Sequence, residues 1–377
     1  MPNARRVLSV TLLAALIATS QAVLNGGSCS AATGLTCPEK NPCCSEFGHC
    51  GDTVAHCRGG CDPRVSAPNS CSNGETSSVH YNFHLTILVP ICEDLEIKAF
   101  DRTAWSRVTQ KPEDYDGEAD QYDFTLDKGD ITREENMLTM IMDEDNKGTR
   151  LSSTRYMLYG EFNARMRVTG TNGVISTMIL MSDIHDEVDW EFVGAKTGEG
   201  QSNYYYQGVT DYTNGDTHKF PTDGQFHDFG FNWQEDKLEW KIDGQVVRTL
   251  RKDDTVGWDK KAHYPESPSR LQFSVWPSGI EDVSPGSFEW GGGKIDWSKG
   301  PFKATIQSIS IKCGRSSEVP IGPDDISWEY NNQTSSQIAF QASPEPYKAS
   351  SGGSSLHVSS PFTLMLSLSF ALLYLVI

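Results

Sequence analysis

The sequence has 377 residues, and its 50 acidic and 32 basic side chains give a formal net charge of −18. Phosphate contacts require clustered lysine and arginine, so this charge argues against nucleic acid as a partner, whereas neutral polysaccharides carry no such penalty. The 10 cysteines suit an oxidising, extracellular compartment.

The N-terminus is typical of a secretory signal peptide. Arg5 and Arg6 precede an apolar run over residues 7–17, and small residues near Ala22 provide a cleavage site. We therefore assign residues 1–22 to a signal peptide and expect the mature protein to be secreted.

A cysteine-dense module occupies residues 23–72. This stretch is rich in Gly, Ser and Pro and has too few apolar residues to build a core, so disulfides must hold it together. Eight cysteines permit on the order of a hundred pairings, and spacing alone does not choose among them. A zinc site is the alternative, although the Cys-x-x-Cys pairs typical of metal sites are absent. The eight are Cys29, Cys37, Cys43, Cys44, Cys50, Cys57, Cys61 and Cys71.

The adjacent Cys43 and Cys44, followed by Ser45, resemble the hevein-like chitin-binding domain. The resemblance implies four disulfides: Cys29 with Cys44, Cys37 with Cys50, Cys43 with Cys57, and Cys61 with Cys71. It also implies that chitin contacts Ser45, Phe47, His49 and His56.

Two of these positions depart from the family pattern. His49 and His56 stand where Trp or Tyr is usual, and imidazole offers less stacking area and gains charge below neutral pH. We therefore expect chitin affinity to be weak or pH-dependent. The alternative is a disulfide-stapled spacer that binds little.

Residues 95–313, reached through a linker at 73–94, show the pattern of an all-β domain. Short runs that alternate apolar and polar residues are separated by turn signals, among which Asn-Gly and Asp-Gly are the strongest for hairpins. Helical periodicity is scarce, and a region of this length with many hairpins fits one β-sandwich. The clearest strands are predicted at 160–168, 174–181, 229–233 and 307–312.

The segment Glu187-Val188-Asp189-Trp190-Glu191 is the strongest functional signal. Alternate side chains of a strand share one face, so the three carboxylates project together on a cleft floor while the apolar residues between them pack behind. Like charges without a counter-ion repel, so at least one carboxyl group should hold its proton more tightly than in water, as a general acid requires. The alternative is a solvated strand edge.

This charge pattern suits cleavage of a glycosidic bond. We assign Glu187 as the nucleophile, Glu191 as the acid/base, and Asp189 as the group that orients Glu187 and tunes both proton affinities. Residues i and i+4 of a strand are about 13 Å apart at the backbone, whereas a retaining pair needs its carboxyl groups about 5 to 5.5 Å apart. The two Glu side chains must therefore lean inward over a curved strand, as on a concave sheet.

The nine residues from Asp186 to Gly194 resemble the catalytic signature of glycoside hydrolase family 16, in the form typical of the fungal Crh cell-wall transglycosylases. The resemblance implies a β-jelly-roll sandwich of the concanavalin A type with the carboxylates on its concave face. It further implies a retaining mechanism and transfer of a chitin chain onto another wall glucan. Flanking segments that agree in order and spacing include Leu151-Ser152-Ser153-Thr154-Arg155-Tyr156, Gln201-Ser202-Asn203-Tyr204, Trp276-Pro277 and Glu289-Trp290-Gly291-Gly292.

Sugar recognition needs flat aromatic faces for pyranose rings and polar partners for hydroxyl groups. By family analogy, Trp276 is a stacking platform, and Gln201 and Asn203 bind hydroxyl groups near the reacting ring. Tyr204 is a further candidate. The alternative for Trp276 is a place in the core, where tryptophans of a β-sandwich often lie.

Other residues are expected to be structural. Trp233 and Trp240 are predicted to lie in the sandwich core, and His227 to be a structural histidine. Cys92 and Cys313, left over from the module, are expected to form a disulfide that ties together the two ends of the all-β domain.

The C-terminal region is predicted to contain a second targeting signal. Residues 314–350 are rich in Ser, Pro, Gln and Asn and are predicted to form a solvated stalk with a glycosylation sequon at Asn332. The alternative for Trp328 and Tyr330 is a place against the sandwich, so the boundary of the stalk stays open. The apolar run 362–377 is shorter than the roughly 20 residues of a spanning helix. Residues 351–377 are therefore typical of a GPI-anchor signal, with an attachment point within residues 350–353, for which we take Gly352. The alternative is a plain membrane anchor.

Three functions fit these features. The one that we favour is a retaining transglycosylase that cleaves chitin, holds the fragment on Glu187, and passes it to a β-glucan hydroxyl with Glu191 as base. The second is a hydrolase of chitin or β-glucan, which differs only in whether water intercepts the intermediate. The third is a non-catalytic cell-wall protein that binds chitin. We expect a monomer, GPI-anchored to the plasma membrane or incorporated in the cell wall, with no cofactor and no metal.

Overall fold

The computed structural model describes residues 27–31, 33–45, 48–57, 61–67, 70–71, 87–115, 117, 119–168, 170–209, 211–221, 224–281, 283–331 and 339–345. The signal peptide, Phe47, Asn332, Gly352 and the C-terminal anchor signal lie outside these residues and stay predictions. Within the described ranges, the model contains no helix with the length and apolar character to cross a membrane.

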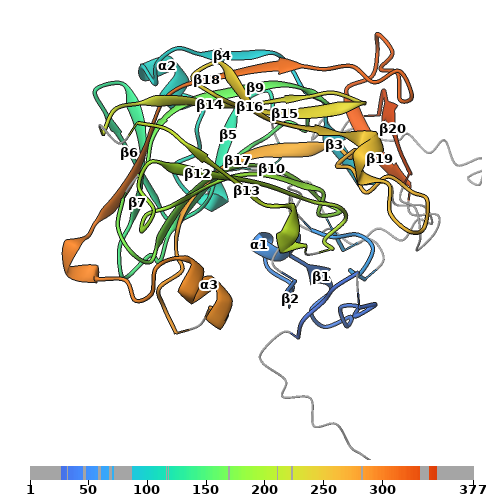
Figure 1. Ribbon diagram of the computed structural model, residues 1–377. Helices are drawn as coiled ribbons and strands as arrows, with labels where there is room; N and C mark the ends of the chain where they lie inside the picture. The colour runs from blue at the N-terminus through green and yellow to red at the C-terminus, as the bar shows by residue number, and fades with distance from the viewer. Residues whose placement is uncertain are drawn as a thin grey trace, which may run out of the picture.

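Two antiparallel sheets pack face to face and form the main body of the protein (Figure 1). The seven-stranded sheet has the order β13 (Asp216–Lys219), β12 (Glu199–Tyr205), β11 (Glu187–Val193), β10 (Val174–Ser182), β17 (Ser269–Pro277), β8 (Thr149–Ser153) and β5 (Phe124–Lys128). The second sheet has the order β16 (Gln245–Arg251), β15 (Lys237–Ile242), β14 (His227–Trp233), β9 (Gly160–Arg167), β18 (Phe302–Cys313), β7 (Met137–Met142) and β6 (Asp130–Glu134), and β4 (Leu95–Ile97) pairs with β18. This sandwich confirms the all-β prediction.

Smaller elements surround the sandwich. The cysteine-rich module contains β1 (Cys43–Cys44), β2 (Cys50–Gly51) and α1 (Val54–Cys57). A third sheet has the order β20 (Ala339–Ser343), β19 (Ser327–Asn331) and β3 (Ile87–Pro90). The remaining helices are α2 (Arg102–Ser106), α3 (Pro285–Trp290), and the 3-10 turns η1 (Pro112–Asp114), η2 (Tyr212–Asn214), η3 (Lys252–Thr255) and η4 (Trp297–Lys299).

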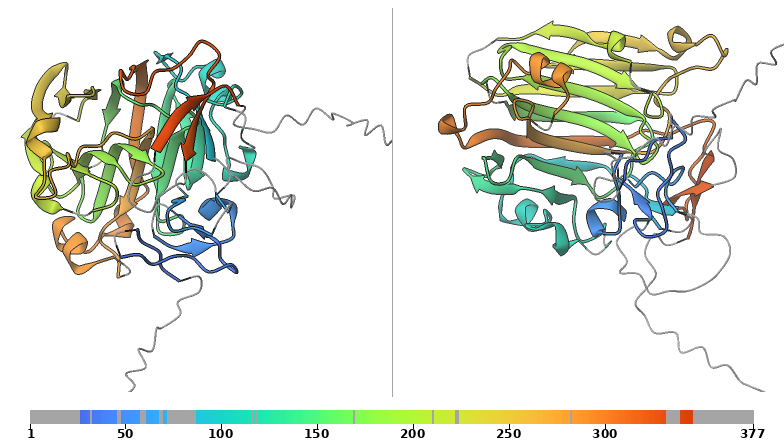
Figure 2. Two further views of the ribbon diagram at one scale, coloured as in Figure 1. Left: turned by 90° about the vertical axis from the view of Figure 1, so that its right-hand side faces the viewer. Right: turned by 90° about the horizontal axis from the view of Figure 1, so that it is seen from below.

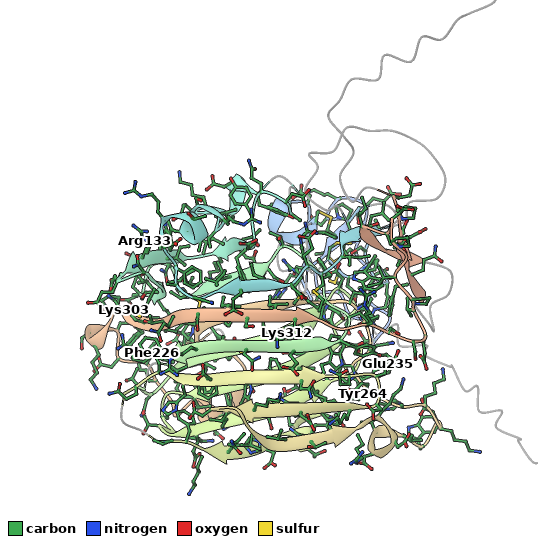
Figure 3. All side chains as sticks on the ribbon, turned by 90° about the horizontal axis from the view of Figure 1, so that it is seen from above. Arg133, Phe226, Glu235, Tyr264, Lys303 and Lys312 are labelled. Carbon is green, nitrogen blue, oxygen red and sulfur yellow. A yellow bond between two sulfur atoms is a disulfide. The ribbon has the colours of Figure 1, made fainter. Side chains whose placement is uncertain are left out.

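The core lies between the two large sheets. Along β11, Val188, Trp190 and Phe192 are buried, and Phe192 packs against Phe229 of β14 with 4.4 Å between ring centroids. Tryptophans also link the sheets through hydrogen bonds, since the Nε1 of Trp190 donates to the Gly230 carbonyl at 3.2 Å. The opposite side of the second sheet faces outward, and Figure 3 shows Lys303 and Lys312 of β18 on it. Apolar side chains therefore fill the interior and leave the outer faces to polar groups.

Trp233 and Trp240 are fully buried, which confirms their predicted place in the core. His227 is also buried, and its Nδ1 lies 2.8 Å from Asp243 Oδ2. His227 belongs to β14 of the second sheet and not to the sheet that contains β11. This position fits the structural role that was predicted for it.

The first part of the predicted stalk packs on the sandwich, as the alternative for Trp328 has it. Trp328 of β19 is buried, and its Nε1 donates to the Tyr156 carbonyl at 3.1 Å. Earlier in the same segment, the hydroxyl groups of Ser316 and Ser317 both donate hydrogen bonds to the carboxylate of Glu235. Glu235 lies in the turn between β14 and β15 and is labelled in Figure 3. The buried indole gives this otherwise polar segment an apolar contact, so the domain extends beyond residue 313.

The disulfides are those expected. Cys92 and Cys313, separated by 221 residues, are bonded and tie β18 to the segment that precedes β4. The module contains Cys29–Cys44, Cys37–Cys50, Cys43–Cys57 and Cys61–Cys71.

Candidate active site

Strand β11 carries Glu187, Asp189 and Glu191 on one face of the seven-stranded sheet, here called the carboxylate face. Glu187 and Glu191 are partly exposed, whereas Asp189 between them is only 1% exposed. The three residues alternate with the core residues of the same strand, as a period of two requires. The carboxylates therefore line up on the side of the sheet that points away from the core.

Burial raises the pKa of all three carboxyl groups. It raises the pKa of Glu191 to about 8, with the charge of Glu187 as the second cause. The pKa of Asp189 is raised well above its ordinary range by burial and then by the charges of Glu187 and Glu191. The pKa of Glu187 is also raised by burial, but a hydrogen bond from Asp189 opposes the rise. Of the three groups, Glu187 is therefore the one whose ionised form is favoured most, while Asp189 and Glu191 hold their protons more tightly.

Asp189 depends on Glu187 for its hydrogen bonding. Among the described residues, neither carboxyl oxygen of Asp189 receives a hydrogen bond from a backbone or side-chain donor. The group that interacts with it is the Glu187 carboxyl. A buried acid with no other partner donates its proton to the neighbouring carboxylate, so Asp189 can both orient Glu187 and hold it ionised.

Strand β12 places three polar residues beside the row. Gln201 lies opposite Glu191, Asn203 opposite Asp189, and Tyr205 opposite Glu187. Directly opposed residues of an antiparallel pair share a face. The register thus brings Gln201 and Asn203 to the carboxylate face, where they had been predicted.

Tyr205 takes the place that was predicted for Tyr204. Tyr204 lies opposite Val188, is 8% exposed, and packs in the core, with the Arg248 guanidinium 5.8 Å from its ring centroid. The prediction for Tyr204 is therefore wrong, because neighbouring residues of a strand point to opposite faces. The hydroxyl of Tyr205 accepts a 2.8 Å hydrogen bond from Asn203 Nδ2. Burial and the nearby carboxylates raise the pKa of Tyr205, so its own proton stays available for donation.

A pair of stacked indoles borders the Glu191 end of the row. The ring of Trp276 on β17 is partly exposed and stacks on Trp290 of α3, with 6.2 Å between centroids and 24° between planes. The Nε1 of Trp290 donates to Gln201 Oε1 at 2.8 Å. Trp290 was not predicted as a site residue, because it reaches Gln201 across 89 positions of sequence. The Trp-Gly-Gly segment that contains it was the available signal.

The carboxylate face also carries a buried cation that the motif did not reveal. Arg270 of β17 lies opposite Met181 of β10, and Met181 lies opposite Glu187, so the guanidinium is two strands away from Glu187. Arg270 is 6% exposed, and its Nε has no hydrogen-bond partner in the described part of the chain. Further across the sheet, Asp127 accepts a 3.0 Å hydrogen bond from Arg150 Nε. The face therefore offers polar groups well beyond the catalytic strand.

The segment that leads into β11 is firmly held. Asp186 is buried and accepts hydrogen bonds from the Gln207 and Glu266 main-chain nitrogens at 2.9 and 3.0 Å, and from Ser267 Oγ at 2.5 Å. Burial raises its pKa to about 6. The Oδ1 of Asp183 accepts a 2.9 Å hydrogen bond from Tyr156. These anchors fix the start of the strand that carries Glu187.

In the N-terminal module, the predicted chitin-binding residues differ in exposure. Ser45 is buried, and its Oγ accepts a 3.4 Å hydrogen bond from the His49 main chain, while the His49 side chain is exposed. The Nδ1 of His56 lies 2.7 Å from Thr53 Oγ1. Phe47 lies outside the described residues.

Three sulfur atoms of the module come within 4.8 Å of one another, those of Cys29, Cys37 and Cys50. All three are bonded in disulfides. The zinc alternative for these cysteines requires free thiolates, so it does not fit the bonded sulfurs.

Comparisons with known proteins agree with this geometry. The profile of "Glycosyl hydrolases family 16" matches residues 118–299. "Crh-like protein 3" of Botryotinia fuckeliana is 33% identical over 311 residues, which are 78% of this chain and 64% of that protein. "Crh-like protein 2" of Aspergillus fumigatus is 35% identical over 322 residues, which are 82% of this chain and 67% of that protein.

Among solved structures, "Apo Crh5 transglycosylase" matches with a TM-score of 0.54 and 25% identity, covering 66% of this chain and 92% of that chain. This chain spans about two thirds of the length of the two curated relatives. It belongs to glycosyl hydrolase family 16 and, within that family, to the Crh-like proteins.

Proposed function

We propose that the protein is a retaining transglycosylase that cleaves chitin and transfers the fragment to a β-glucan of the cell wall. The observation that carries the proposal is the difference in proton affinity between the carboxyl groups of Glu187 and Glu191 on β11. Glu191 has a pKa of about 8 and is protonated at neutral pH, while Glu187 receives the hydrogen bond of Asp189. One acid and one anion on the same face are what glycosidic bond cleavage requires.

In the first step, the Glu187 carboxylate attacks the anomeric carbon of the donor chain, and the glycosidic carbon–oxygen bond breaks. Glu191 gives its proton to the departing oxygen, which leaves as the hydroxyl group of the released chain. The remaining fragment is then held as an ester on Glu187. Asp189 keeps its proton during this step and steadies the carboxyl group of Glu187.

In the second step, Glu191 is ionised and acts as a base. It takes the proton of an acceptor hydroxyl, whose oxygen attacks the anomeric carbon of the ester. The ester bond to Glu187 breaks, and both carboxyl groups return to their starting states. Two inversions at the same carbon retain its configuration.

Several features support polysaccharide substrates. The stacked indoles of Trp276 and Trp290 border the row, and the face carries amide and guanidinium donors that suit hydroxyl groups. The N-terminal module has the disulfides that its resemblance to hevein-like chitin-binding domains implies. A similar protein is named a transglycosylase. Chitin as donor and a β-glucan as acceptor are the substrates that unite these features, at a cell wall reached by secretion and a GPI anchor.

Hydrolysis is the second candidate. It uses the same three carboxyl groups, and the family as a whole is named for glycosyl hydrolases. The two reactions differ in the molecule that attacks the ester on Glu187, since water replaces the acceptor hydroxyl.

The test incubates the purified protein with chitin oligosaccharides and a fluorescent β-1,3-glucan oligosaccharide, followed by mass analysis. We expect fluorescent products heavier than the acceptor, and no such products with Glu187→Gln. Glu161→Gln on β9 of the second sheet is the matched control and should retain activity, because Glu161 lies on the other sheet, away from the carboxylate face. Shortened chitin without fluorescent hybrids would establish the hydrolase instead. Unchanged mixtures would favour a non-catalytic wall protein.

A further inference from the structure

The N-terminal module is seated against the catalytic domain through a small polar contact. Asp62 of the module is 2% exposed and accepts hydrogen bonds from Arg64 Nε at 2.9 Å and Nη2 at 2.8 Å. Across the contact, Arg64 Nη1 donates to the Gln207 carbonyl at 3.4 Å, and His185 Nε2 lies 3.7 Å from Asp62 Oδ2. An ion pair buried at a junction holds a fixed geometry better than an exposed one.

This contact meets the catalytic domain beside the carboxylate row. His185 precedes Glu187 by two residues, and Gln207 follows Tyr205 by two residues. Glu187 and Tyr205 lie opposite each other. The module therefore borders the Glu187 end of the row, as Trp290 borders the Glu191 end.

The figures show the same arrangement. In Figure 1 the module, with α1, β1 and β2, lies below the sandwich on the right, and α3 lies below it on the left. The view from below in Figure 2 places both over the same side of the seven-stranded sheet. A polysaccharide chain on the carboxylate face therefore has the module at one side.

A cavity of about 240 Å³ lies between the module and the catalytic domain. The module contributes Ser30, Asp62 and Arg64 to its lining, and the catalytic domain contributes His185 and Gln207. At about 30 Å³ of liquid volume per water molecule, the cavity has room for roughly eight waters. The volume of the cavity is therefore comparable with the volume of one sugar ring.

The lining offers both donors and acceptors. The Nε2 of His185 is buried and makes no hydrogen bond to any residue that the structure describes. Burial lowers the pKa of His185, so the ring is neutral near pH 7. Arg64 has five N–H donors. Among the described residues, its hydrogen bonds to Asp62 and Gln207 use Nε and one N–H each of Nη1 and Nη2, which leaves further N–H groups able to donate. Because Asp62 neutralises the charge of Arg64, the cavity favours a neutral polar ligand over an anion.

We propose that this cavity is a sugar-binding site built jointly by the two modules, which takes one pyranose unit of the chitin chain that occupies the carboxylate face. The inference rests on the proposed function, since it assumes that a glycan lies on that face. Hydroxyl and acetamido groups of the sugar would bond to His185 Nε2 and Arg64 in place of water. The module then extends the substrate-binding surface instead of only tethering the enzyme to the wall.

The test replaces His185 by Asn. His185 has a φ of 64°, and Asn adopts this left-handed backbone more readily than most residues. The variant keeps the main-chain hydrogen bond that the His185 carbonyl accepts from Gly208 at 2.8 Å and removes the ring nitrogen. Lys147→Asn is the matched control, because Lys147 is exposed and has a φ of 49°.

Both substitutions are made in the full-length Glu187→Gln protein, and calorimetry measures the binding of β-1,4-linked N-acetylglucosamine oligosaccharides of increasing length. We expect a gain in affinity at the length that reaches the cavity. His185→Asn should lose this gain, by about three- to tenfold, and leave the affinity for shorter oligosaccharides unchanged. Lys147→Asn should retain the gain.

An equal loss at every length would mean that His185 only supports the catalytic strand, and it would overturn the proposal. An unchanged length dependence, or no binding at any length, would overturn it as well. The proposed function fails separately, in the transfer assay on the protein with Glu187 intact. A protein that shows the length-dependent loss but transfers no fragment would keep the shared site and reject the transglycosylase.

Discussion

The indole nitrogen of Trp240 donates a 2.9 Å hydrogen bond to the main-chain carbonyl of Asp189. A fully buried tryptophan of the second sheet thus holds the central residue of the carboxylate row from behind. The catalytic strand is therefore positioned by the core as well as by its neighbours in the sheet.

Trp240→Phe tests this support. Phenylalanine keeps most of the buried apolar area but leaves the Asp189 carbonyl without its donor, so we expect a loss of about 1–3 kcal/mol in the free energy of unfolding. Because the backbone of Asp189 can then shift, kcat should also fall, by about threefold or more. Thermal unfolding and initial rates measure the two effects.

Trp233→Phe is the matched control for Trp240→Phe. Trp233 is equally buried, but its Nε1 donates to the Pro265 carbonyl at 3.0 Å, not to the catalytic strand. A similar loss of stability with an unchanged kcat is expected. If both variants lowered kcat equally, the bond to Asp189 would have no special part in catalysis.

Trp290 should matter mainly for substrate binding. Trp290→Ala removes both the stacking partner of Trp276 and the donor to Gln201. We expect the KM for the chitin donor to rise by roughly tenfold and kcat to change little, because neither contact reaches the three carboxyl groups. Trp290→Phe, which keeps a ring but no N–H, should give an intermediate KM.

Trp258→Ala is a useful comparison, since the Trp258 side chain is 95% exposed. Its KM should equal that of the unmodified protein. A lower kcat with an unchanged KM in Trp290→Ala would contradict the binding role of Trp290.

The disulfide between Cys92 and Cys313 closes a loop across most of the domain, with a sequence separation of 221 between the two cysteines. Replacing both cysteines by serine should lower the free energy of unfolding by about 2–5 kcal/mol, because the unfolded chain gains freedom. Chemical denaturation measures the loss. Activity at low temperature should persist, since the bond lies at the second sheet and not on the carboxylate face. Unchanged stability would show that β19 and β3 hold the two ends without it.

Local patterns predicted the parts of the site that lie on a single strand. The alternation in β11 placed Glu187, Asp189 and Glu191 on one face, because a period of two is a property of the strand itself. The register between strands is not local, so the position of Arg270 two strands from Glu187 could not be read from the sequence. Tyr204 was misplaced for a different reason, since the alternation within the strand already puts it on the opposite face from Gln201 and Asn203.

Contacts between distant segments were the other limit. Trp290 reaches Gln201 from a short helix, across 89 positions of sequence. The contact of Arg64 with Gln207 joins two modules across 143 positions. Such contacts depend on how the elements pack, and neither propensity nor spacing encodes that directly.

The pKa of Glu191 gives the activity a predicted alkaline limit. The first step needs a protonated Glu191, and its pKa is about 8. The rate of chitin cleavage should therefore fall as the pH rises through about 8, tenfold for each further pH unit. Initial rates measured from about pH 3 to about pH 10, a range that brackets both 4.5 and 8, test this limit. A decline already complete near the ordinary pKa of Glu, 4.5, would exclude Glu191 as the acid.

The same shift predicts how stability depends on pH. The pKa of Glu191 is 4.5 in its ordinary state and about 8 in the folded protein, so the folded state binds a proton that the unfolded state releases between these values. The contribution of this group to stability is therefore fully present below about pH 4.5 and is lost as the pH rises to about 8. Glu191→Gln cannot ionise, so it should unfold at a higher temperature than the unmodified protein at about pH 9 and at a similar temperature near pH 4.

Glu161→Gln on the second sheet is the control for Glu191→Gln, and it should leave the unfolding temperature unchanged at both pH values. A stability difference that is the same at both pH values would mean that Glu191→Gln acts through packing and not through ionisation. An increase in the unfolding temperature of Glu191→Gln at high pH alone would show that the ionised form of Glu191 destabilises the folded protein there. It would also show that the fold gives up stability at alkaline pH in order to keep the acid protonated near neutral pH, where the first step needs it.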